Sequence, residues 1–429
     1  MSLANNVEFL RHLPKPGRFG GLAELGRNLR PDLHSPLAVV KGFGSNPGNL
    51  RMFSYVPVML QHPRALVVVL HGCGQTATGY DVGAGWSTLA KHYGFALLMP
   101  EQQASNNANG CFNWFNPEDI ARERGEACSI RQMIARMAGD HGIDPHRIFI
   151  TGLSAGGAMT SVMLANYPEL FAAGAIIAGL PFGVASNIRE ALTGMRASRT
   201  RTARDLGDLV RKASDHRGKW PKISVWHGSA DRTVYPANAD EIVKQWLDVH
   251  RLPLEPMSDG IVDGYPRQVW WDAHGETVVE SYSITDMAHG TPLGIAETDK
   301  RYGTQGAFMI EAGISSSYHI AKFFGLTNWI REPKPAVPVA TPKPPRMSVA
   351  DSPSAKLIPT VSPIPSPLPI QLPNIGKALW PATKPTPQPK REPEPKREPE
   401  PKREPQKKRR AVDISAALTR VLTAAGLMK

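Results

Sequence analysis

The chain has 429 residues, of which 41% are hydrophobic and three are cysteines, and its formal net charge is +12. This length and apolar fraction allow a sizeable folded core, while three cysteines exclude a disulfide-rich scaffold. Residues 331–410 hold 17 Lys and Arg, 7 Asp and Glu and 22 of the 40 prolines, so the rest of the chain has a net charge of only +2. The charge therefore belongs to a tail, and we expect no specific nucleic-acid binding.

Residues 1–35 are polar and weakly patterned, which predicts a poorly ordered N-terminal arm. They contain no apolar segment of the kind that a signal peptide needs. The longest apolar run, 171–180, is far shorter than the ~18–20 residues that span a membrane. From these features we expect a cytoplasmic or granule-associated protein rather than a secreted one.

Residues 36–328 alternate between strand and helix patterns, which predicts one α/β domain with a mostly parallel central sheet flanked by helices. The continuous apolar runs 65–72, 95–101, 147–152, 172–179 and 221–228 are typical of buried parallel strands. Segment 50–58 alternates like an antiparallel strand, and 267–284 is typical of two strands around a turn. Helices are predicted over 86–94, 129–142, 155–168, 239–250 and 316–326. Residues 186–216 interrupt the alternation and predict a helical insertion over one edge of the sheet.

Residues 329–410 form a Pro-rich, basic, low-complexity linker that ends in the repeats "PKREPE", "PKREPE" and "PKREPQ". Such composition cannot bury enough apolar surface to offset its ordering entropy, and it favours extended, disordered chain. Residues 411–429 then predict a short amphipathic helix, with Asp413 as its N-cap. We expect this helix to dock on a polymer granule, a membrane surface or another protein, or to pack back onto the catalytic domain.

The run "ITGLSAGGAMT" contains G-x-S-x-G, with Ser154 between Gly152 and Gly156. It lies between a predicted strand and a predicted helix, which is the setting of a nucleophile elbow. A serine held on a strained turn needs neighbours without bulk, which explains the glycines. The alternative is an ordinary Gly-rich turn in which the serine is incidental.

A serine nucleophile requires a histidine base and a carboxylate to orient it, in the chain order Ser, acid, His for this motif. Asp231 follows the strand 221–228 and is the favoured acid. Asp240 falls inside a predicted helix, and Asp286 remains a weaker rival.

Four histidines follow Asp231 in the chain: His250, His274, His289 and His319. His289 comes directly after a strand and lies in a Gly- and Pro-containing loop, so it is the favoured base. The others fall in helices or at a hairpin turn.

The tetrahedral intermediate of ester hydrolysis needs two N–H donors directed at its oxyanion. We predict the backbone N–H of Ala155 and that of Cys73, in the loop "HGCGQTATG", with His71 and Gln75 close to the substrate. Cys73 is equally compatible with a small buried apolar residue, because the donor is main chain.

With these residues in place, the run 65–290 resembles the esterase family of poly(3-hydroxybutyrate) depolymerases. The resemblance rests on "LHGCGQTA", "FNWFNPED", "GEACSIRQM", "IDPHRIFITGLSAGGAMTSVMLANYPELFAAGAIIAGLPFG", "WHGSADRTVYPAN" and "MAHG". It implies an α/β-hydrolase fold, a triad of Ser154, Asp231 and His289, and hydrolysis of polyhydroxyalkanoate, feruloyl or acetyl esters without a metal or other cofactor. The chain departs from secreted members in its apparent lack of a signal peptide, in "HGTPLG" where a Trp-Pro pair is usual, and in its tail.

Trp114 and Phe115 are candidates for lining the substrate groove, although aromatic residues are more often core. Cys111 and Cys128 are a possible disulfide pair, with two free thiols favoured, and no cysteine has zinc-ligand spacing. The alternative functions are a feruloyl or acetyl esterase of plant cell-wall material, and a non-catalytic binding protein whose basic tail meets anionic partners.

Overall fold

The computed structural model describes residues 35–58, 64–196, 201–296 and 301–327. Apart from Ser35, the predicted N-terminal arm (1–35), linker (329–410) and terminal helix (411–429) lie outside these ranges. In the described part of the chain no helix is both long and apolar enough to cross a membrane.

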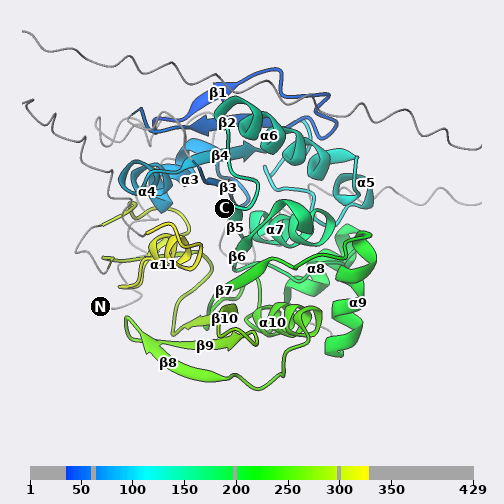
Figure 1. Ribbon diagram of the computed structural model, residues 1–429, viewed down its shortest axis with the longest axis vertical. Helices are drawn as coiled ribbons and strands as arrows, with labels where there is room; N and C mark the ends of the chain where they lie inside the picture. The colour runs from blue at the N-terminus through cyan, green and yellow to red at the C-terminus, as the bar shows by residue number, and fades with distance from the viewer. Residues whose placement is uncertain (1–34, 59–63, 197–200, 297–300, 328–429) are drawn as a thin grey trace, which may run out of the picture. The chain divides into compact units, whose positions relative to one another are not determined.

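A ten-stranded sheet forms the centre of the domain, in the order β1-β2-β4-β3-β5-β6-β7-β10-β9-β8 (Figure 1). The six central strands run parallel to one another, in the order β4-β3-β5-β6-β7-β10. At the two edges, β1, β2, β9 and β8 pair antiparallel to their neighbours. The bounds are Ala38–Val40 (β1), Arg51–Tyr55 (β2), Leu66–Leu70 (β3), Ala96–Glu101 (β4), Ile148–Leu153 (β5), Ala173–Ile177 (β6), Lys222–Gly228 (β7), Ser258–Val262 (β8), Tyr265–Trp271 (β9) and Thr277–Ile284 (β10). A separate pair joins Thr291–Leu293 (β11) to Met309–Glu311 (β12).

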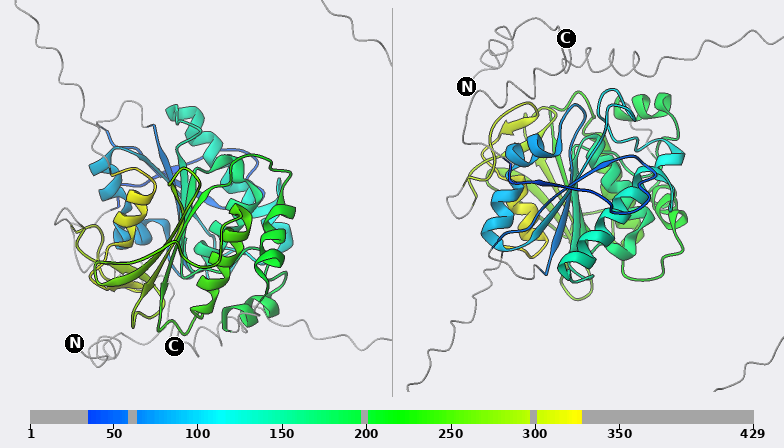
Figure 2. Two further views of the ribbon diagram at one scale, coloured as in Figure 1. Left: turned by 60° about the horizontal axis from the view of Figure 1, so that its bottom comes forward. Right: turned by 90° about the horizontal axis from the view of Figure 1, so that it is seen from above.

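Helices cover both faces of the sheet (Figure 2). Side chains of α3, α4 and α11 share one hydrophobic cluster with the sheet, and those of α6, α7, α9 and α10 share another. The helices are Ala77–Ala84 (α3), Trp86–Tyr93 (α4), Pro117–Ile120 (α5), Gly125–His141 (α6), Ala155–Asn166 (α7), Ile188–Arg196 (α8), Ala203–Ala213 (α9), Ala237–His250 (α10) and Ser316–Phe323 (α11), with a 3-10 turn at Pro168–Leu170 (η1).

The mostly parallel sheet flanked by helices confirms the predicted fold class. The strands β3, β5 and β6 are buried at every residue, as continuous apolar runs predict. Because β3, β5, β6, β7 and β10 are parallel, the loops that follow them all leave from one edge of the sheet.

Two of the differences from the sequence prediction concern the insertion and one edge of the sheet. The insertion forms α8 and α9, but it does not cover an edge of the sheet: α9 packs on α10, where Arg211 forms an ion pair with Asp248. A further strand, β8, pairs with β9 through a tight turn in which Asp263 and Gly264 have positive φ. Residues 258–262 are mostly exposed, so they lack the apolar alternation that predicts a strand.

Candidate active site

Ser154 lies on the turn between β5 and α7, with φ 57° and ψ −117°. Its N–H donates to the carbonyl of Ile177 at 2.9 Å, which ties the turn to the neighbouring strand β6. A Cβ on Gly152 would lie less than 3.0 Å from the Gly156 carbonyl, and a Cβ on Gly156 less than 3.0 Å from the Leu70 carbonyl. The two glycines therefore allow the backbone to close around a serine whose φ is unusual for an L-residue.

The loops after β7 and β10 are joined to each other by main-chain hydrogen bonds. The two strands are adjacent and parallel, with Gly228 opposite Ile284. Beyond them, Ser229 N–H donates to Ile284 O at 2.9 Å and Ala230 N–H donates to Met287 O at 3.1 Å. A Cβ on Gly228 would collide with Met287 O, so glycine permits this close approach.

These loops bring Asp231 and His289 together. His289 Nδ1 lies 2.7 Å from Asp231 Oδ2, and the two residues are only 8% and 3% exposed. The other carboxylate oxygen, Oδ1, accepts from the N–H groups of Thr233 at 2.8 Å and Val234 at 3.0 Å. Burial alone raises the pKa of Asp231, but hydrogen bonds from His227 and His289 outweigh it and hold that pKa well below its usual range.

The other histidines considered from the sequence have different partners. His250 Nε2 lies 3.0 Å from Pro221 O, and burial lowers its pKa to about 4. His319 Nε2 lies 2.8 Å from Asp263 Oδ2, and His274 is exposed at the turn between β9 and β10.

The rival acids do not share the position of Asp231. Asp240 lies in the first turn of α10, and Asp286 is exposed with φ 57° on the loop before His289. The arrangement therefore pairs His289 with the acid that follows β7.

The loop after β3 is fastened to the 102–113 segment by a disulfide between Cys73 and Cys111. This corrects the cysteine prediction, because Cys128 is the free and buried thiol. Gly74 N–H also donates to Asn109 O at 2.8 Å. The loop is therefore joined to this segment at two neighbouring residues, by the disulfide and by a main-chain hydrogen bond. Neither Cys73 nor Ala155 donates its backbone N–H to an acceptor among the described residues.

His71 is the first residue of this loop, and its burial does not support the predicted position close to the substrate. It is fully buried, with Nδ1 2.8 Å from Gly72 O and Nε2 accepting from Gln102 N–H at 3.1 Å, and burial lowers its pKa to about 4. Gln75 accepts from Gly72 N–H at 2.8 Å and donates to Ala307 O at 3.4 Å. It thereby bridges the loop after β3 to the chain before β12.

Trp114 is buried in the core and meets Phe115 edge to face, while Phe115 is half-buried. Two further residues at the site were missed by sequence reasoning. Phe308 has φ 62° and presents its ring 6.1 Å from that of His289, and His227, at the end of β7, contacts Asp231. Phe308 lies in an irregular segment that no motif marks, whereas His227 stands inside the motif "WHGSADRTVYPAN", where its place in an apolar strand pattern gave no sign of a contact with Asp231.

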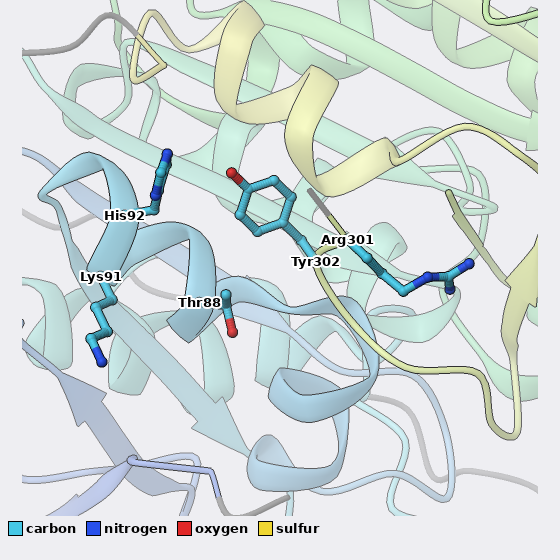
Figure 3. Close-up of a pocket in the computed structure, with 5 residues that line it drawn as sticks. All are labelled: Thr88, Lys91, His92, Arg301 and Tyr302. Atoms are coloured by element: carbon cyan, nitrogen blue, oxygen red, sulfur yellow. The ribbon is translucent and has the colours of Figure 1, made fainter. Parts of the chain in front are cut away.

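An open hollow of about 420 Å³ lies elsewhere, lined by Thr88, Lys91 and His92 of α4 together with Arg301 and Tyr302 (Figure 3). None of the predicted site residues lines it. Among the residues that the structure describes, no group of three or more His, Cys, Asp or Glu has an arrangement that would hold a metal ion.

Residues 53–253 match the model of the family described as esterase PHB depolymerase. Over 291 residues the chain is 46% identical to poly(3-hydroxyalkanoate) depolymerase C of Paucimonas lemoignei, which covers 68% of this chain and 70% of that protein. The chain belongs to the PHB depolymerase family of esterases. Its resemblance to the family, expected from the motifs, is thereby confirmed.

Esterases with other names are also similar to this chain. An acetylxylan esterase of Coprinopsis cinerea is 34% identical, and the match covers 60% of this chain and 69% of that protein. Feruloyl esterase B of Neurospora crassa is 31% identical, and the match covers 69% of this chain and 94% of that protein. The solved structure of the acetyl xylan esterase from Aspergillus awamori matches with a TM-score of 0.55 and 29% identity, over 59% of this chain and 94% of that one. This PHB depolymerase family member is accordingly a carboxylic ester hydrolase with an α/β-hydrolase fold.

Proposed function

We propose that the enzyme hydrolyses short-chain polyhydroxyalkanoate esters, with Ser154 as nucleophile, His289 as base and Asp231 as the orienting acid. The observation that carries this proposal is the buried hydrogen bond between His289 Nδ1 and Asp231 Oδ2. That bond leaves His289 Nε2 free to accept a proton, at the sheet edge where Ser154 also lies. The low pKa of Asp231 keeps the carboxylate charged to stabilise an imidazolium.

In the first half-reaction, Ser154 Oγ attacks the ester carbonyl carbon while His289 takes the hydroxyl proton. The N–H groups of Cys73 and Ala155, which have no acceptor in the described chain, stabilise the resulting oxyanion. The C–O bond to the alcohol then breaks, and His289 returns the proton to the departing oxygen. Water repeats the sequence on the acyl-enzyme and releases the acid.

The substrate class rests on the relative with 46% identity, whose name specifies poly(3-hydroxyalkanoates). A second candidate is an acetyl or feruloyl ester of plant cell walls. It is favoured by the likeness to the solved acetyl xylan esterase and by the identity to the acetylxylan and feruloyl esterases.

The experiment compares one purified sample on 3-hydroxybutyrate oligomers, amorphous poly(3-hydroxybutyrate), acetylated xylan and methyl ferulate. The expected result is the highest kcat/KM on the hydroxybutyrate oligomers. A higher kcat/KM on xylan acetyl or feruloyl esters would replace the proposed substrate class and leave the mechanism intact.

The triad is tested with p-nitrophenyl butyrate. Ser154→Ala and His289→Ala should each lower kcat by roughly 10⁴-fold or more, and the double variant should be little worse because the residues act as a unit. His274→Ala is the matched control and should keep full activity. Near-normal activity in His289→Ala would refute the assignment.

Partners and location are a separate part of the proposal, supported by the sequence alone. The +10 charge of 331–410 and the amphipathic pattern of 411–429 favour docking of a granule-associated enzyme on an apolar, anionic surface. Deleting 331–429 should reduce co-sedimentation with polymer granules and leave hydrolysis of p-nitrophenyl butyrate unchanged. Loss of activity on that small ester would show that the segment belongs to the catalytic domain.

A further inference from the structure

Asp231 has a second histidine partner besides His289. Nε2 of His227 lies 3.3 Å from Oδ2, the same carboxylate oxygen that His289 contacts at 2.7 Å. His227 is the penultimate residue of β7 and is 3% exposed. The carboxylate therefore receives N–H groups on Oδ1 from the backbone and on Oδ2 from two imidazoles.

The second contact of His227 fixes which of its nitrogens carries hydrogen. Nε2 also lies 2.8 Å from the carbonyl oxygen of Val234. A carbonyl only accepts, so Nε2 carries the hydrogen that Val234 O accepts, and Asp231 Oδ2 lies 3.3 Å from the same nitrogen. Nδ1 is buried and has no hydrogen-bond partner among the described residues, and a second proton there would be a buried donor without an acceptor. His227 therefore donates through Nε2 in this arrangement.

We propose that His227 is a positioning residue for the reaction. Its Nε2–H orients the carboxylate of Asp231 so that Oδ2 faces His289, and it partly offsets the negative charge on Oδ2. The inference rests on the proposed function, because it assigns Asp231 and His289 to the triad. Val234 completes the arrangement by fixing the ring of His227 through its carbonyl and one oxygen of Asp231 through its N–H.

The contact between the His227 N–H and the negative charge of Asp231 Oδ2 has a consequence for the pH dependence of catalysis. Without the His227 N–H, Oδ2 interacts with His289 alone, and the imidazolium form of His289 becomes more stable. Since the base acts in its neutral form, the acidic limb of the kcat/KM profile should move to higher pH. Among the described residues, the ionisable groups that interact with His227 are Asp231, on the loop after β7, and Asp240 on α10, and neither is altered in the experiment.

The experiment uses the full chain and three variants of His227. His227→Phe keeps the ring volume and removes both nitrogens. His227→Asn keeps an amide but does not extend to the position of Nε2. His227→Gln places an N–H near that position and is the matched control.

The measured quantities are kcat and KM for p-nitrophenyl butyrate between pH 5 and 9. In His227→Phe and His227→Asn the acidic limb of the kcat/KM profile should shift to higher pH by roughly half a unit, as expected for the loss of one weak hydrogen bond. In the same two variants kcat at pH 7 should fall about tenfold with KM unchanged. His227→Gln should restore the wild-type limb. The inference would be overturned if the acidic limb stayed at the wild-type pH in both His227→Phe and His227→Asn, even if kcat or Tm fell, because a purely structural role of His227 predicts that result.

A second readout does not depend on activity. The N–H proton shared by His289 and Asp231 should give a strongly downfield proton resonance, identified by its loss in His289→Gln. Its titration should shift in His227→Phe and His227→Asn in the same direction as the kinetic limb, and an unchanged titration would overturn the inference. Because this measurement does not involve Ser154, it separates failure of the inference from failure of the proposed nucleophile.

Discussion

Removing the Cys73–Cys111 disulfide should lower both stability and catalytic rate. The bridge joins residues 38 apart in sequence. On the chain-entropy model, opening a loop of this length costs about 4 kcal/mol of unfolding free energy at 25 °C. For a domain of about 290 residues that corresponds to a decrease in Tm of about 7 °C. The N–H of Cys73 is also a proposed oxyanion donor, so a looser loop should lower kcat about tenfold, with less effect on KM.

The assay compares wild type, the double variant Cys73→Ala/Cys111→Ala, and the control Cys128→Ala, each with and without tris(2-carboxyethyl)phosphine. Reductant should bring wild type and Cys128→Ala down to the Tm of the double variant and should not change the double variant itself. Two results would refute the reasoning. One is a double variant whose Tm equals that of wild type without reductant, and the other is a reductant that lowers the Tm of the double variant as much as it lowers the Tm of wild type.

Three other predictions concern separate features. Gly156→Ala places a Cβ against the Leu70 carbonyl, so we expect a loss of several kcal/mol in urea unfolding or failure to fold, whereas Gly139→Ala on α6, with open space around it, should be tolerated. Burial, reinforced by the charge of Asp119, raises the pKa of Glu126 to about 8 from 4.5. The folded state then retains a proton that the unfolded state releases, so the unfolding free energy should fall between pH 4.5 and 8 by up to about 1.4 kcal/mol per pH unit. Glu126→Gln should flatten this slope, and an equal slope in the variant would contradict the assignment. Dialysis against EDTA should leave hydrolysis of p-nitrophenyl butyrate unchanged, and a loss that added metal restores would contradict metal-free chemistry.

The sequence predicted the strands of the parallel sheet correctly, because their local apolar pattern agrees with their buried position in the fold. The apolar runs before Ser154, Asp231 and His289 predicted strands, and parallel strands place their following loops at one edge of a sheet. Sequence reasoning failed where contacts depend on loops that fold over one another. The pairing of Cys73 with Cys111 requires the 102–113 segment to lie on the loop after β3, and cysteine connectivity cannot be deduced from spacing.

The position of His227 could not be predicted for a related reason. A histidine inside "PKISVWHG" is compatible with any buried strand position, and its role depends on how the 229–236 loop turns back onto it. The strand β8 was missed because its side chains are mostly exposed, so it is stabilised by pairing with β9 more than by burial.

The joining of the two loops through their main chain also bears on how new substrate preferences could arise. The hydrogen bonds from the N–H groups of Ser229 and Ala230 to the chain after β10 do not depend on which side chains the loops carry. On the same loops, Tyr235, Thr285 and Ala288 are exposed. Mutation at these three positions should therefore leave Asp231 and His289 together, and a library randomised there should retain a high fraction of active enzymes. A backbone that fixes the proposed acid and base in this way leaves the side chains of both loops free to vary with substrate preference.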